Sequence, residues 1–237
     1  MIPLRDDTPR FSTPYITYFI IALNALVFIF ELSVGMPGSH GFDRLMYQMG
    51  AVPSHLQAAL GGSTHYTLPG FLFNVLTSMF VHGGFLHIIG NMWVLWIFGD
   101  NIEDYVGHFP YLLFYLVTGF AAAMTQVLLS VGSNIPIVGA SGAIAGVMGA
   151  YFILYPRARV LTIVPLIVFF TFWWLPAWIV LGYWILVQFL SGAATSASQA
   201  GQSGGVAFWA HVGGFVAGII LIKILPQRRG RYRYAAW

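Results

Sequence analysis

Polar side chains stand inside apolar stretches at three places in this sequence, each among small residues. His87 and Asn91 belong to HIIGN, Ser141 to GASGA and His211 to AHVGG. A bilayer penalises buried polar groups, so polar residues within apolar spans usually mark a functional site. A serine, two histidines and an asparagine are groups that can carry out acyl transfer by an activated hydroxyl.

The composition indicates which surroundings hold these residues. The chain is 58% hydrophobic and only 7% charged, with a mean hydropathy of +0.78, whereas soluble domains carry about 25% charged residues. We therefore predict a single membrane-embedded domain over residues 1–237 with short cytoplasmic tails. The absence of cysteine excludes disulfides and thiolate chemistry. The basic residues lie at the ends of apolar segments, which indicates membrane orientation and not nucleic-acid binding.

Six apolar segments predict an all-α membrane protein. The fourth is about 24 Å long as a helix, shorter than the hydrocarbon core of about 30 Å. It fits if its start, with Ser141, lies below the membrane surface. The stretch 35–70 is too polar to span, and 191–205 predicts a flexible outer loop. The predicted helices cover residues 15–32, 84–104, 109–130, 141–156, 172–190 and 207–225.

Lysine and arginine predict the orientation. If both termini are cytoplasmic, all but one of the ten basic residues fall on the inner side, as the positive-inside rule requires. Arg44 is the exception. The inner residues are Arg5, Arg10, Arg157, Arg159, Lys223, Arg228, Arg229, Arg231 and Arg233.

His87 and Asn91 are four residues apart on a predicted helix, so they share one face. Both side chains donate hydrogen bonds, as a developing oxyanion needs. The alternative is that they bond neighbouring helices together.

Ser141 stands between Gly139 and Gly142 at a helix start, where its backbone N–H is free to face a negative oxygen. The alternative is helix packing through small residues such as Gly142 and Gly146. The sequence is not the nucleophile elbow, whose fifth residue is glycine.

His211 precedes Gly214 and Gly218, a spacing that allows close approach to a neighbouring helix. If that helix carries Ser141, the imidazole reaches the hydroxyl. None of the seven acidic residues is obviously placed to orient His211, so the residues favour a Ser–His dyad.

Together these motifs resemble the rhomboid family of intramembrane serine proteases over about residues 73 to 218. His87 and Asn91 match its H-x-x-x-N pair. The other matching residues are Gly139, Ser141 and Gly142 in G-x-S-G; Ala210, His211, Gly214 and Gly218 in A-H-x-x-G-x-x-x-G; and His82, Glu103 and Gly107.

The resemblance implies a six-helix bundle with a water-filled cavity open to the outer side and no cofactor or metal. Ser141 would be the nucleophile, His211 the base, and His87 and Asn91 the oxyanion donors, with His82 supporting the site. It also implies transmembrane protein substrates, a lipid bilayer as surroundings, and a multi-pass location in a prokaryotic inner membrane. The sequence does not set the oligomeric state or the substrate.

Two departures from the family pattern stand out. Phe73-Asn74 replaces Trp-Arg in the first loop, and Ala145 replaces an aromatic that stacks on the catalytic histidine. Trp209 or Phe215 is the expected substitute for that aromatic.

Three alternatives stay open: an inactive relative that binds transmembrane segments, a haem or metal protein using His82, His87 and His211, and, less favoured, a transporter. For a protease, we expect the segment 172–190 and the loop 191–205 to form the substrate gate.

Overall fold

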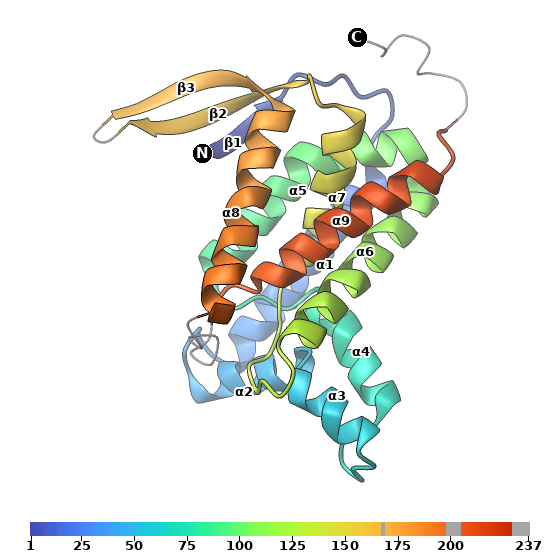
Figure 1. The fold of residues 1–237 in the computed structure, drawn as a ribbon, viewed down its shortest axis with the longest axis vertical. Helices are drawn as coiled ribbons and strands as arrows, with labels where there is room; N and C mark the ends of the chain where they lie inside the picture. Colours follow the sequence, from blue (N-terminus) through green and yellow to red (C-terminus); the bar gives the residue numbers. More distant parts are fainter. Residues whose placement is uncertain (167–168, 198–204, 229–237) are drawn as a thin grey trace.

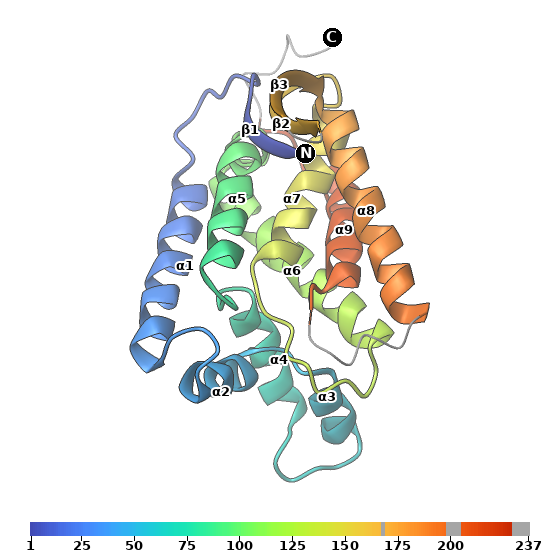
Figure 2. The ribbon, with the colours of Figure 1, turned by 90° about the vertical axis from the view of Figure 1, so that its left-hand side faces the viewer.

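The computed structural model describes residues 1–166, 169–197 and 205–228. Its helices form a bundle with α7 (Ser141–Leu154) at the centre (Figures 1 and 2). Every residue from Gly142 to Tyr151 is buried, as expected for a helix that is apolar on all sides. The helices packed against α7 are α5 (Phe85–Val106), α6 (His108–Leu129), α8 (Ala177–Ala197) and α9 (Phe208–Ile224).

Glycines set the close approach of α9 to α7. A Cβ atom on Gly214 would overlap the carbonyl oxygen of Gly142, and one on Gly218 would overlap the carbonyl oxygen of Gly146. The backbones of the two helices therefore touch directly, as small residues allow within membranes. This contact positions the beginning of α9 beside the beginning of α7.

Helix α1 (Tyr15–Val34) begins at a carboxylate supplied by α5. The first backbone N–H groups of a helix have no partner within it, and the preceding Pro14 offers no side-chain cap. Glu103 fills this role, since its carboxylate accepts from the backbone N–H groups of Ile16 and Thr17 at 2.9 and 2.8 Å. Gly107 then joins α5 to α6 with φ +90°, a conformation that favours glycine.

The stretch predicted not to span the membrane folds into short helices at one end of the bundle (Figure 2). These are α2 (His40–Met49), α3 (Pro53–Leu60) and α4 (Leu68–Ser78). Ser39 and Thr67 accept backbone N–H groups at the starts of α2 and α4, as N-cap residues do.

The prediction of an all-α fold was wrong at the end of the bundle opposite α2, α3 and α4. There β1 (Ile2–Asp6), β2 (Arg159–Leu166) and β3 (Phe169–Pro176) form an antiparallel sheet in the order β1-β2-β3. The predicted helix 172–190 instead begins at Ala177. Aromatic and β-branched residues favour strands, and a continuous apolar run does not distinguish a strand from a helix by its periodicity.

The predicted loop 191–205 also begins later than expected. Helix α8 continues to Ala197, and the three alanines in its last turns are the residues there that favour a helix. Residues 198–204 of that loop lie outside the described residues.

Three of the described helices, α1, α6 and α8, are long and apolar enough to cross a membrane. Helices α4, α7 and α9 are shorter apolar helices, and α5 carries acidic residues near its end. Much of the surface of α1, α6 and α8 is exposed and apolar, as expected for helices that face lipid.

Candidate active site

Ser141 and His211 come together across the contact between α7 and α9. Ser141 is the first residue of α7, and His211 lies in the first turn of α9. The glycine contacts between the two helices bring the hydroxyl and the ring together, and Ser141 Oγ lies 2.8 Å from His211 Nε2. His211 is buried, with 7% of its surface exposed, so this hydrogen bond is largely shielded from water.

A third polar side chain completes the hydrogen bonds of the imidazole. Gln188 Oε1 on α8 lies 2.7 Å from His211 Nδ1. An amide oxygen only accepts, so Nδ1 carries the proton, and Nε2 is left to accept the proton of the Ser141 hydroxyl. This tautomer is the one a general base needs. No acidic residue takes this position among the described residues.

The aromatic ring beside His211 comes from α8. The ring centroids of Trp184 and His211 are 5.5 Å apart, with the ring planes inclined by 39°. The expected substitutes for the aromatic missing at Ala145 make other contacts. Trp209 packs edge-on against Phe189, and Phe215 contacts Trp184, not the imidazole. Helix α8 therefore holds His211 by both an amide and an indole.

His87 and Asn91 on α5 face the loop that precedes Ser141. The backbone N–H of Gly83 donates to His87 Nδ1 at 3.3 Å, so His87 Nε2 carries a proton available for donation. Gly139 has φ +113°, and a Cβ on it would lie 2.6 Å from His87 Nε2. Asn91 Nδ2 is buried without a hydrogen-bond partner in the described part of the chain. Two side-chain donors therefore lie close to the turn that leads into α7.

His82 is buried beside His87, with ring centroids 5.2 Å apart. Its Nδ1 lies 3.2 Å from the carbonyl oxygen of Phe80, and its backbone N–H donates to the carboxylate of Glu31 at 3.1 Å. Glu31 is fully buried in α1. These contacts fix the turn from which His87 projects.

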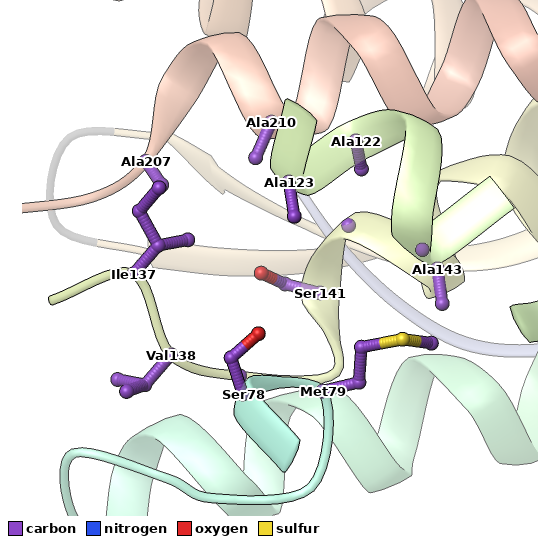
Figure 3. A pocket seen from close by; sticks show the side chains of 13 residues that line it. Ser78, Met79, Ala122, Ala123, Ile137, Val138, Ser141, Ala143, Ala207 and Ala210 are labelled. Carbon is purple, nitrogen blue, oxygen red and sulfur yellow. The ribbon is translucent and has the colours of Figure 1, made fainter. Parts of the chain in front are cut away.

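Ser141 Oγ points into a small cavity (Figure 3). Ser78, Ile137 and Ala207 lie around the hydroxyl, and the cavity's volume of ≈ 20 Å³ has room for about one water molecule. The loop forming one wall is fixed by three backbone hydrogen bonds. The Gly139 N–H donates to the Ser78 carbonyl oxygen at 2.8 Å, and Ile137 and Ala51 each donate their N–H to the other's carbonyl oxygen at 2.9 and 3.1 Å. The nucleophile candidate therefore borders space that a water molecule fits.

The structure thus brings together the four polar residues predicted from the sequence. Gly139 lies against His87 and Asn91, and Gly142, Gly214 and Gly218 lie where α9 packs on α7. Sequence reasoning missed Gln188, Trp184 and Glu31. Gln188 carried a usable signal, because it is an amide within the apolar run of α8. Nothing in the sequence indicated that Trp184, among many aromatics, would contact the imidazole.

The chain is similar to known proteins over most of this region. The rhomboid domain model matches residues 69–228. The chain is 28% identical to the mitochondrial rhomboid protein 1 of Saccharomyces cerevisiae over 172 residues, 69% of this chain and 46% of that protein. It is 33% identical to the rhomboid protease GluP of Bacillus subtilis over 137 residues, 58% of this chain and 24% of that protein.

A shorter match, 38% identical over 76 residues, is to RHOMBOID-like protein 6 of Arabidopsis thaliana, and it covers 32% of this chain and 24% of that protein. The chain spans 24% of the length of two of these relatives and 46% of the length of the third. The domain match covers more than half of the chain and includes Ser141, His211, His87 and Asn91, and so the chain belongs to the rhomboid family.

Proposed function

We propose that this protein is an intramembrane serine endopeptidase that hydrolyses peptide bonds in or near transmembrane segments. The observation that carries the proposal is the hydrogen-bonded chain Ser141–His211–Gln188, with distances of 2.8 and 2.7 Å. A nucleophile in contact with a base, whose other nitrogen is held by a third group, is the arrangement that activates a hydroxyl.

In the first step, Ser141 Oγ attacks the carbonyl carbon of the scissile peptide and gives its proton to His211 Nε2. A carbon–oxygen bond forms, and the carbonyl π electrons move onto the carbonyl oxygen. His211 becomes an imidazolium, whose Nδ1–H donates to the neutral amide oxygen of Gln188. This hydrogen bond strengthens as the charge appears, because charged donors form stronger hydrogen bonds.

The new oxyanion would be stabilised by donors on the other side of Ser141. His87 Nε2–H and Asn91 Nδ2 are the side-chain candidates, and the backbone N–H of Ser141 is a third because it begins α7. The unpartnered amide of Asn91 supports this role, since a buried donor without a partner costs free energy unless a ligand satisfies it.

The intermediate collapses when His211 passes its proton to the peptide nitrogen, and the carbon–nitrogen bond breaks. The acyl group then remains on Ser141 as an ester. A water molecule in the adjoining cavity gives a proton to His211 and attacks the ester carbon. The bond between that carbon and Ser141 Oγ then breaks, His211 returns the proton to Ser141 Oγ, and the carboxylic acid product leaves.

In the proposed arrangement six helices of the protein cross the bilayer, namely α1 and α5 to α9. Both termini would face the cytoplasm by the positive-inside rule. Arg44 in α2 is the only Lys or Arg of the described residues that lies at the end of the bundle away from the sheet (Figure 1). The proposed location is a prokaryotic inner membrane. Substrate segments would enter sideways from lipid past α8, which contacts His211 directly.

The haem and metal alternative is not favoured by the geometry of His211. Both of its ring nitrogens already contact protein side chains, Ser141 at Nε2 and Gln188 at Nδ1. A metal ligand needs one nitrogen free.

The test is labelling of the purified protein with a fluorophosphonate, followed by mass spectrometry of the modified residue. We expect label on Ser141 and none after Ser141→Ala. Ser78→Ala is the matched control, because the Ser78 hydroxyl borders the same cavity but donates its hydrogen bond to the carbonyl oxygen of Val75. This variant should leave labelling intact. A folded protein without label on Ser141, and without cleavage of a transmembrane substrate, would favour the inactive relative.

A further inference from the structure

The hairpin formed by β2 and β3 projects sideways from the bundle, at the end where α7 finishes and α8 begins (Figure 1). The chain from Val160 to Pro176 contains no charged residue. Exposing so apolar a hairpin to water is unfavourable, so we expect another surface to cover it.

The register of the hairpin shows where its apolar side chains lie. Residues paired across an antiparallel sheet share a face, and one face carries the pairs Leu161–Trp174, Ile163–Phe172 and Pro165–Phe170. On the other face, Val160 and Thr162 at the base of the hairpin are fully buried against the protein. The aromatic side chains of β3 are largely uncovered: Phe169 76%, Phe170 71%, Phe172 63%, Trp173 51% and Trp174 44% exposed.

The surroundings of the hairpin indicate a bilayer surface as the covering partner. The exposed apolar side of α8 follows β3 directly in the chain, with Trp178 and Leu186 about half exposed. Arg5, Arg157 and Arg159 are exposed at the base of the hairpin. The Arg5 guanidinium lies 5.4 Å from the centre of the Trp174 ring. Aromatic rings next to arginines are the composition of the zone between headgroups and acyl chains.

The hydrogen bonding of the sheet sets the depth of such contact. β1 pairs with one edge of β2, and β3 is the outer strand on the other side. Its outward backbone groups need water or headgroups as partners, because the hydrocarbon core offers none. The hairpin therefore suits the boundary layer and not the centre of the bilayer.

We propose that the β2–β3 hairpin lies flat in the boundary between headgroups and acyl chains of the leaflet at the sheet end of the bundle. Its arginines would face lipid phosphates. This proposal goes beyond the proteolytic function, since it requires only that the bundle crosses the bilayer. It gives the protein a lipid-binding surface at the base of α8, the helix that holds His211.

The absence of cysteine makes the test direct. Single cysteines replace Phe172 in the hairpin, Leu186 on the exposed side of α8, and Thr64 in the exposed turn between α3 and α4. Each carries a nitroxide label, and each protein is reconstituted in vesicles of phosphatidylcholine and phosphatidylglycerol. Spectra measured with oxygen, which partitions into lipid, and with a water-soluble nickel chelate report the depth of each label.

We expect the label at Phe172 to be relaxed by oxygen more than by nickel, as at Leu186 but at a shallower depth, whereas Thr64 favours nickel. A Phe172 label that behaves like the Thr64 label would overturn the proposal. So would spin–spin broadening at Phe172 that disappears on dilution with unlabelled protein, because a second copy would then cover the hairpin. Phe170→Cys repeats the measurement at another exposed position, and because no readout involves proteolysis, the result is independent of the proposed function.

Discussion

Gln188 offers the sharpest test of how the candidate site works. Replacing it by leucine keeps the approximate volume but removes the oxygen that accepts from His211 Nδ1 at 2.7 Å. The imidazole then has a buried N–H without a partner, and the tautomer that lets Nε2 accept from Ser141 is no longer favoured.

The size of the effect follows from the hydrogen bond to the imidazolium formed during attack. Hydrogen bonds to charged groups contribute about 1.5–3 kcal/mol. Since about 1.4 kcal/mol is a factor of ten in rate, kcat of Gln188→Leu should fall by about 10- to 150-fold. KM should change little, because Gln188 contacts the base and not the cavity beside Ser141.

The assay is cleavage of a model transmembrane substrate in proteoliposomes, with kcat and KM determined separately. Gln188→Glu keeps an acceptor oxygen at the same reach and should retain most of the activity. The matched control is Gln126→Leu, which removes a glutamine that accepts from the backbone N–H of Ala210, next to His211. Full kcat in Gln188→Leu, or an equal loss in Gln126→Leu, would refute the positioning role.

Three further predictions concern other parts of the molecule. Asn91→Ala should lower kcat by about 10²–10³ with little change in KM, as for loss of one oxyanion donor; an effect on thermal stability alone would make Asn91 a packing residue. Gly214→Ala should lower both activity and the thermal midpoint, and it should reduce the free energy of unfolding by about 1–3 kcal/mol, because its Cβ would overlap the Gly142 carbonyl oxygen. The control Gly90→Ala has no atom within 4 Å of the added Cβ and should be harmless. Burial lowers the pKa of His55 in α3 below its usual 6.5, so the folded state holds the neutral ring and the unfolded state takes up protons first. Stability should therefore fall as the pH drops from about 7 to about 5. A thermal midpoint that is equally pH-dependent in His55→Phe would contradict this.

The sequence determined the candidate chemistry because a bilayer makes misplaced polar groups costly. His87, Asn91, Ser141 and His211 stood out from apolar surroundings without any structure. The helix starts near Tyr15 and Ser141 were also predictable, since a long apolar run must satisfy its backbone hydrogen bonds as a helix within lipid.

Only the tertiary structure decided which residues hold the base and where the chain leaves the helical pattern. Gln188 and Trp184 reach His211 because α8 packs against α9, and helix pairing depends on contacts remote in sequence. The run from Arg159 to Pro176 suits a strand or a helix equally well by its apolar composition. In the structure this run forms β2 and β3, and β2 pairs with the distant β1. Such pairing depends on the tertiary structure, because strand hydrogen bonds form between segments and not within one.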